Sequence, residues 1–173
     1  MNHLYAPWRS EYSASVAHAK LETTTEKDCV FCNHLQDNAD EKHFILKRFK
    51  HTFVLLNRYP YNAGHLLILP YQHIATLPEL SLEARTELME VAAHCYTIVK
   101  QVLSADGVNM GINFGKAAGA GIPAHLHQHV LPRWFGDTNF LPTLSDTKQI
   151  SFDLNEVYKK LKPSFEDIKI TLL

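Results

Sequence analysis

Histidine occupies alternate positions at 125, 127 and 129 of this 173-residue chain. Side chains of a β-strand alternate between its two faces, so a strand over 125–133 would place all three imidazoles on one side, about 6.6 Å between neighbours. Leu126 and Val130 would then face a core on the other side. Imidazole titrates near neutral pH and is costly to bury without a partner. Three on one face of a packed strand therefore indicate a chemical task rather than a solvated polar surface.

The rest of the apolar pattern predicts how this strand is packed. Four further β-rich runs are separated by short turns, and they cover residues 44–49, 52–57, 65–70 and 108–114. Ser81 is a candidate N-cap for one long helix, in which apolar residues recur at helical spacing to about Leu103. Residues 33–43 are polar and predict a loop, and 155–161 predict a short C-terminal helix. We expect an α+β fold with an antiparallel sheet of about five strands, in a single domain over 1–173 with its core at about 44–135.

Charge and hydropathy exclude several classes of partner. The chain has 17 Lys and Arg against 18 Asp and Glu, a net charge of −1, so it has no basic field for a nucleic-acid polymer. No apolar run approaches the roughly 20 residues that span a bilayer, and residues 1–9 lack the apolar stretch of a signal peptide. Three cysteines, an odd number, argue against a disulfide framework. We therefore expect a cytoplasmic protein that binds a small molecule at a shaped site and does not bind membranes.

A glycine-rich loop precedes the histidines, with glycine at 111, 115, 119 and 121. Glycine lets the backbone pass close to a ligand and direct N–H groups at one anion. Alternate histidines on a strand can ligate a metal such as zinc, or the middle one can act as a nucleophile between two supporting neighbours. A phosphate-binding loop beside them favours the nucleophile, although a zinc enzyme that activates water stays open.

Three segments together resemble the histidine-triad superfamily. They are the His-x-His-x-His run followed by Val-Leu-Pro-Arg at 125–133, the Leu-Asn-Arg-Tyr-Pro run at 56–60, and Gly64-His65 leading into an apolar strand that ends at Pro70. The ends of the chain, 7–12 and 133–140, resemble the bacterial branch that contains diadenosine tetraphosphate phosphorylases. The resemblance implies a histidine-triad-like fold and a homodimer in which two sheets join into one.

The resemblance also implies roles for particular residues. His127 would attack the α-phosphorus of a nucleotide and form a covalent nucleotidyl-histidine, while His129 and loop N–H groups hold the phosphoryl oxygens. His65 would orient the triad or relay protons. Asn57 would bind the ribose hydroxyls, and the phosphates would lie near Asn113, Gly119 and Gly121. The apolar residues Phe44, Ile45, Phe53 and Leu55 are candidates for a purine slot or for the core.

A second cluster begins with the Cys-x-x-Cys sequence at Cys29 and Cys32. Such a pair can be a redox motif or half of a tetrahedral zinc site. Some histidine-triad relatives carry a zinc held by such a pair, and the resemblance implies that His73 and His125 complete a closed, structural site here. His51 is the reserve ligand if His73 points elsewhere. We expect no organic cofactor.

The expected activity is that of a nucleotidyl hydrolase or transferase. Its substrates would be adenosine-containing dinucleoside polyphosphates or nucleoside phosphoramidates. Two alternatives stay open, a phosphate-dependent diadenosine polyphosphate phosphorylase and a nucleotide-binding protein without turnover. The phosphorylase branch often has a serine in the loop before the triad, whereas residues 117–122 carry no hydroxyl. A missing hydroxyl removes one hydrogen bond to an incoming phosphate, worth about 1 kcal/mol, so we expect water as the acceptor.

Overall fold

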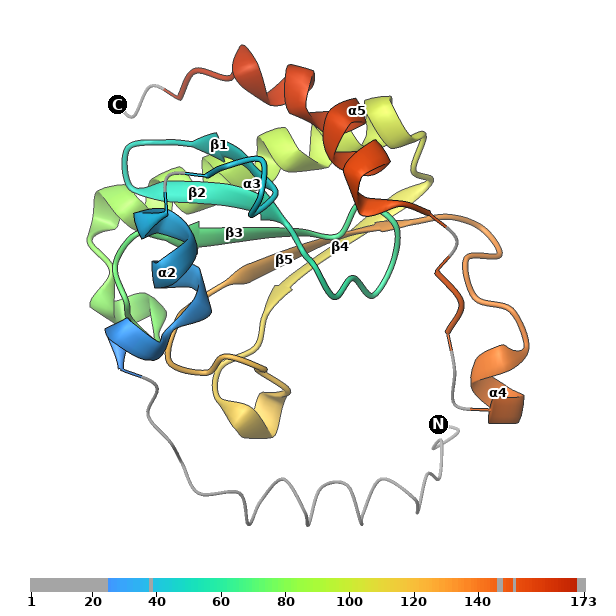
Figure 1. The fold of residues 1–173 in the computed structure, drawn as a ribbon, viewed down its shortest axis with the longest axis horizontal. Helices are drawn as coiled ribbons and strands as arrows, with labels where there is room; N and C mark the ends of the chain where they lie inside the picture. Colours follow the sequence, from blue (N-terminus) through green and yellow to red (C-terminus); the bar gives the residue numbers. More distant parts are fainter. Residues whose placement is uncertain (1–24, 38, 146–147, 151, 171–173) are drawn as a thin grey trace.

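The computed structural model describes residues 25–37, 39–145, 148–150 and 152–170 (Figure 1). The motif at 7–12 therefore lies outside the described residues. Five strands form one antiparallel sheet, which confirms the expected class. Along the sheet they run in the order β1 (Ile45–Arg48), β2 (Thr52–Leu56), β3 (Leu66–Pro70), β5 (Gln128–Arg133) and β4 (Gly107–Ile112).

Two helices cover one face of this sheet. The long helix α3 (Leu82–Leu103) begins as predicted, because Ser81 Oγ accepts a hydrogen bond from the N–H of Ala84 at 3.2 Å. The C-terminal helix α5 (Leu154–Glu166) is longer than predicted and continues through Pro163. A proline costs a helix one hydrogen bond, but Phe165 beyond it is fully buried and holds the last turn against the core. No helix in the described ranges combines the length and the apolar character needed to cross a membrane.

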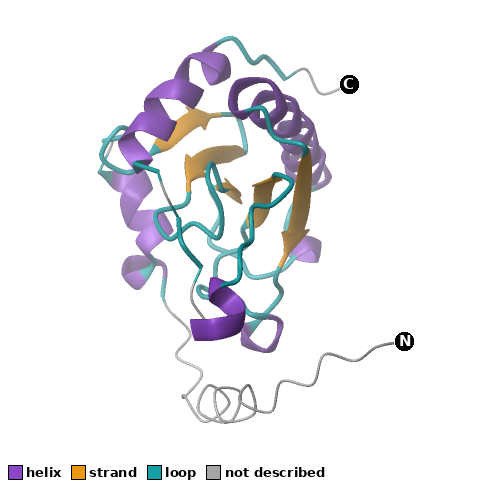
Figure 2. Ribbon diagram, turned by 90° about the vertical axis from the view of Figure 1, so that its right-hand side faces the viewer, coloured by secondary structure: helices purple, strands orange, loops and turns teal. Residues whose placement is uncertain are grey.

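A shorter helix, α2 (Val30–Gln36), lies on the opposite face of the sheet (Figures 1 and 2). It overlaps the start of the loop predicted at 33–43, and that prediction was wrong there. The helix forms because Phe31 and Cys32 are buried against the sheet, which a polar sequence around them does not reveal. A second short helix, α4 (Leu141–Ser145), follows β5.

The alternation of strand side chains divides the interior into two cores. Val54 and Leu56 of β2 pack with α3 and α5, whereas their neighbours Phe53 and Leu55 pack with α2. Beside β3, β5 continues the pattern, since Val130 belongs to the α3 core and His129 lies on the other face. His125, His127 and His129 therefore lie on the side of the sheet that α2 covers.

The histidine segment is only partly strand. The strand predicted over 125–133 begins three residues later, at Gln128. Before it, the N–H of Leu126 donates to the carbonyl of Ile74 at 2.6 Å instead of joining the sheet ladder. The side chain of Leu126 nevertheless packs in the α3 core, so the predicted separation of leucine from histidine holds.

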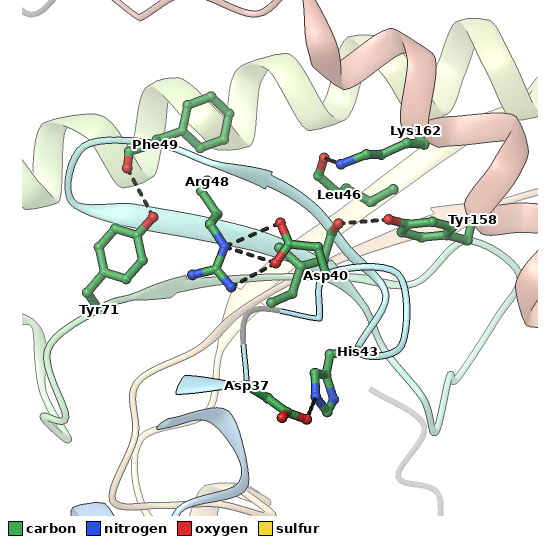
Figure 3. A network of polar contacts seen from close by, with 10 residues as sticks. Asp37, Asp40, His43, Leu46, Arg48, Phe49, Tyr71, Tyr158 and Lys162 are labelled. Atoms are coloured by element: carbon green, nitrogen blue, oxygen red, sulfur yellow. Dashed lines mark hydrogen bonds and ion pairs between the residues drawn. The ribbon is translucent and has the colours of Figure 1, made fainter. Parts of the chain in front are cut away.

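The two edges of the sheet differ. At the β1 edge, Tyr158 and Lys162 of α5 donate to the carbonyls of Ile45 (3.1 Å) and Leu46 (2.8 Å), as Figure 3 shows. At the other end β4 pairs with β5 alone, and its central residues 109–111 are exposed. Hydrogen bonds from a helix therefore cover one edge strand, whereas the other, β4, has a neighbouring strand on one side only among the described residues.

Candidate active site and metal site

His65 and His129 form a hydrogen-bonded pair across β3 and β5, with Nε2 of His65 2.8 Å from Nδ1 of His129. The backbone N–H of Tyr61 can only donate, and it lies 3.1 Å from Nδ1 of His65. The proton of neutral His65 is therefore on Nε2 and is donated to His129. It follows that neutral His129 carries its own proton on Nε2, a buried atom without a hydrogen-bond partner among the described residues.

Both members of this pair are neutral at pH 7. Burial, and then the neighbouring His129, lowers the pKa of His65 to about 3. Burial, and then His127, lowers the pKa of His129 to about 4. The ring of Tyr61 lies over both imidazoles, with centroids 4.8 Å from His65 and 5.8 Å from His129. The fixed tautomer of His129 therefore presents an N–H donor on the α2 side of the sheet.

His127 is oriented by the backbone of its neighbour. Its Nδ1 lies 2.8 Å from the carbonyl oxygen of His125, which can only accept, so the proton is on Nδ1 and the lone pair on Nε2. Burial lowers the pKa of His127, and the bond to His125 opposes that shift. The ring centroids of His129 and Phe31 lie 5.1 and 5.5 Å from that of His127. An imidazole with a free Nε2 lone pair beside an N–H donor can attack an electrophilic phosphorus.

Four of the predicted residues form a compact group of metal-binding type. The ligand atoms of Cys29, Cys32, His73 and His125 all lie within 4.8 Å of one another. Nε2 of His125 donates to the carbonyl of Pro70 at 3.0 Å, which directs the Nδ1 lone pair toward Cys29 Sγ at 3.4 Å. Metal-bound histidines commonly donate their other ring nitrogen to a carbonyl in this way. The group could therefore hold a metal ion.

The chemistry of the two thiols agrees with that role. Burial, and then Cys29, raises the pKa of the Cys32 thiol to about 12 in the metal-free chain. A cation would have to displace these protons, and would then neutralise the buried thiolates. His51, the reserve ligand, lies at the turn between β1 and β2, where its backbone N–H donates to Glu87 at 2.8 Å. His51 does not belong to this group of ligand atoms, and His73 does.

A pocket of about 230 Å³ opens on the α2 side of the sheet. Phe31 lines it, and the ring centroid of Phe31 lies 5.5 Å from those of both His125 and His127, so one aromatic side chain connects the pocket wall to the histidines. Asn57 also lines it, and its amide lies 3.3 Å from Nδ1 of His65. The other lining residues are Val30, His34, His43, Leu55, Leu56, Arg58, Tyr59, Leu67 and Ile122.

Of the residues suggested for a purine slot, only Leu55 lines this pocket. Ile45 and Phe53 are fully buried in the core beneath α2. Phe44 packs against the other core and contacts the ring of Tyr158 at 5.8 Å. The pocket wall is instead supplied by α2, whose position the sequence did not reveal.

The glycine-rich loop makes a tight turn at Lys116–Ala118, flanked by left-handed glycines, Gly115 (φ 78°) and Gly119 (φ 95°). The N–H groups of residues 118, 119 and 120 donate to carbonyls within this loop. Because these three N–H groups already donate within the loop, fewer backbone N–H groups of the loop are available to bind an anion. Asn113 lies against Gly119, and Gly121 is exposed.

Sequence reasoning missed Tyr61 and Phe31. The backbone of Tyr61 fixes the tautomer of His65, and its ring covers the histidine pair. The ring of Phe31 packs against the rings of both His125, a member of the candidate metal-binding group, and His127. In the sequence, Phe31 could be noticed only as an apolar residue inside a polar segment. Tyr61 lies in a turn, where no periodic pattern indicates which side chains point toward the site.

Comparisons with known proteins agree with this geometry. The family model described as the HIT domain matches residues 38–136. The chain is 32% identical over 150 residues to an AP-4-A phosphorylase of Mycobacterium tuberculosis, covering 87% of this chain and 77% of that protein. It is 30% identical over 91 residues to a bis(5'-adenosyl)-triphosphatase of Saccharomyces cerevisiae, covering 52% of this chain and 44% of that protein.

Among solved structures, a zinc-bound histidine triad family protein from Mycobacterium smegmatis superposes with a TM-score of 0.66. It is 26% identical to this chain, and the match covers 82% of this chain and 95% of that one.

Proposed function

Because the chain belongs to the HIT domain family, that of the histidine-triad proteins, we propose that it cleaves dinucleoside polyphosphates at an α-phosphorus with His127 as the nucleophile. One observation gives the strongest support for His127 as the nucleophile. The hydrogen bond from Nδ1 of His127 to the carbonyl of His125 leaves the lone pair on Nε2 free for nucleophilic attack. The names of the two enzyme relatives supply the substrate class.

In the first step, Nε2 of His127 forms a bond to the α-phosphorus as the bond to the bridging oxygen breaks. The remaining nucleotide departs with both electrons of that bond, and a nucleotidyl-histidine is left. Positive charge develops on the ring of His127, and the carbonyl of His125 stabilises it through the Nδ1 proton. This covalent intermediate divides one difficult displacement into two easier ones.

The N–H on Nε2 of His129 donates to an oxygen of the phosphoryl group as negative charge accumulates there. That donor is buried and unpartnered, so no hydrogen bond within the described protein has to break first. His65 acts as a positioning residue, because its bond to Nδ1 of His129 keeps the proton on the side that faces the substrate. Asn57, on the pocket wall beside His65, is placed to bind the sugar.

We propose that Cys29, Cys32, His73 and His125 hold a structural zinc ion. Two thiolates and two imidazoles suit tetrahedral zinc and leave no open position for substrate. When bound, the ion would supply rigidity, because it would fix the residue whose carbonyl orients His127. The zinc-bound relative supports the choice of metal.

The nucleophile is tested by mixing enzyme with diadenosine tetraphosphate and quenching within one turnover. Intact-mass spectrometry should then find one acid-labile nucleotidyl group on wild type and none on His127→Ala. Turnover of His127→Ala should fall by several orders of magnitude, whereas His94→Ala, on α3, should match wild type. Appreciable turnover by His127→Ala would refute the assignment. Nucleotide binding by wild type without any turnover would instead identify a non-catalytic nucleotide-binding protein.

The acceptor in the second step is distinguished by its products. From diadenosine tetraphosphate, water yields AMP and ATP whether or not phosphate is present. Phosphate yields ADP and ATP, at a rate that rises with its concentration. The loop 117–122, without a hydroxyl, favours water, whereas the relative named as a phosphorylase favours phosphate. Our prediction remains hydrolysis, and phosphate-dependent ADP as the main product would overturn it while leaving His127 in its role.

We also propose that two copies pair through β4. Its residues 109–111 are exposed at the end of the sheet, and an antiparallel partner strand would satisfy their backbone groups. Sedimentation should give a dimer for wild type. Met110→Lys places like charges near one another in the paired strands and should shift the protein toward monomer. A wild-type monomer at tens of micromolar would contradict the pairing.

A further inference from the structure

Two histidines that the proposed mechanism does not use, His34 of α2 and His43 before β1, line the same pocket as Asn57. Their rings are stacked, with centroids 4.1 Å apart and an interplanar angle of 21°. Nε2 of His43 lies 2.8 Å from a carboxylate oxygen of Asp37, which Figure 3 shows beside its ring. The side chain of His43 is only 9% exposed.

Both rings have a nitrogen that nothing in the described chain satisfies. Nδ1 of His34 and Nδ1 of His43 are buried and lack a hydrogen-bond partner among the described residues. Buried polar atoms are nearly always paired in native proteins, because an unpaired one loses its bond to water. Two such atoms in one stacked pair on a pocket wall indicate that a ligand completes their hydrogen bonding.

The bond to Asp37 determines what His43 can recognise. A carboxylate only accepts, so Nε2 of His43 carries a proton, and in the neutral ring Nδ1 is then an acceptor. The pocket wall therefore offers the Nδ1 lone pair of neutral His43, which requires an N–H donor from the ligand.

The size of the pocket limits which part of a nucleotide fits. At about 230 Å³ it is smaller than the roughly 300–1,000 Å³ of pockets that enclose whole drug-sized ligands. Apolar side chains such as Val30, Leu67 and Ile122 form much of its remaining wall, which suits a flat aromatic ring. One base, rather than a whole dinucleotide, matches this space and this lining.

We propose that His43, oriented by Asp37 and stacked on His34, is a specificity-determining residue that accepts a hydrogen bond from the exocyclic amino group of an adenine base. The proposal rests on the proposed function, in that it assigns this pocket to the nucleotide that His127 attacks. It excludes a 6-oxo purine such as hypoxanthine, which would bring a carbonyl oxygen against the lone pair of Nδ1. Losing a buried hydrogen bond and setting two acceptors against each other should weaken binding about tenfold or more.

AMP and IMP test this directly, since the two nucleotides differ by the amino or oxo group at one ring carbon. Calorimetric titration of the wild-type protein should give a Kd for IMP about ten times that for AMP. In His43→Phe, which keeps an aromatic ring on His34, the ratio of the two Kd values should fall to about one. In His51→Phe it should stay at the wild-type value, because His51 also has a buried unpartnered nitrogen but lies outside the pocket.

A second variant guards against a folding defect in His43→Phe. Asp37 is exposed to 47%, and Asp37→Asn removes the carboxylate that keeps the proton on Nε2. The tautomer of His43 is then released, so the preference for AMP should shrink without loss of fold. Equal affinity of wild type for AMP and IMP would overturn the proposal, as would a ratio unchanged in both variants. Because binding requires no chemistry, a preference for AMP in a protein without turnover would reject the proposed function alone.

Discussion

Gly64, immediately before His65, occupies a position that should not accept any side chain. Its φ is +67°, in the left-handed region, where an alanine costs about 1–2 kcal/mol. A Cβ there would overlap Cδ1 of Leu103 and lie 3.5 Å from Cγ of Pro132. Leu103 is half-buried at the end of α3 and can move outward, so overpacking should add only about 1 kcal/mol.

Gly64→Ala should therefore destabilise the protein by about 2–3 kcal/mol, which for a chain of this length lowers Tm by roughly 4–12 °C. Urea unfolding followed by tryptophan fluorescence measures the free energy of unfolding. Gly136→Ala is the matched control, because Gly136 has a similar φ of +76° and no described heavy atom within 4 Å of the place of a Cβ. It should lose only the conformational part, about 1–2 kcal/mol.

A double-mutant cycle isolates the overlap with Leu103. In a Leu103→Ala background the penalty of Gly64→Ala should fall to that of Gly136→Ala, because the clashing methyl is gone. If the penalty is the same with and without Leu103, the overlap does not contribute. If Gly64→Ala costs no more than Gly136→Ala, the steric reasoning is refuted.

Three further predictions concern the metal, the histidines and the C-terminal helix. Elemental analysis should find about one zinc per chain in wild type and none in Cys29→Ser or Cys32→Ser, and in these variants Tm should fall before activity does; a metal-free wild type would contradict this. His65 and His129 have pKa values of about 3 and 4 when folded against about 6.5 when unfolded, so the unfolded chain binds more protons below pH 6.5. These groups should leave stability unchanged above that pH, and stability should fall as the pH drops from 6.5 toward 4, as urea titrations at several pH values would show; a flat profile there would refute it. Phe165→Ala, which empties a fully buried site under α5, should cost about 3–5 kcal/mol in the same assay, and a cost below 1 kcal/mol would mean that α5 is not part of the folded core.

The fold was predictable from sequence wherever local pattern and final packing agree. Strands β2 and β3 carry nearly continuous apolar runs between turn residues, and α3 has both a capping serine and apolar residues at helical spacing. Helix α2 was missed because it is only seven residues long and its N-cap, Cys29, makes no side-chain capping bond. Its stability comes from burying Phe31 and Cys32 against strands that lie later in the chain, which is a tertiary effect.

In the candidate site, too, features set by local spacing could be predicted, whereas features set by tertiary contacts could not. Alternate spacing was enough to place His127 and His129 on one face, because that depends only on the extended backbone. The contacts that fix their tautomers could not be predicted, since they join a turn at Tyr61 and a carbonyl at His125 to particular ring atoms. The metal-binding group joins residues up to 96 positions apart, and it was anticipated through resemblance rather than from the spacing itself.

The unequal edges of the sheet have a consequence for how large an assembly can grow. Strand-to-strand association propagates into fibres when both sides of a sheet accept another chain. Here Tyr158 and Lys162 occupy the acceptors of Ile45 and Leu46 on one side, so within the described part of the chain β4 is the one edge strand without such a cover. Two molecules that join through β4, as we propose, would leave no uncovered edge among these strands to recruit a third. We therefore expect polymerisation by this route to stop at two, with helix α5 as the element that stops it.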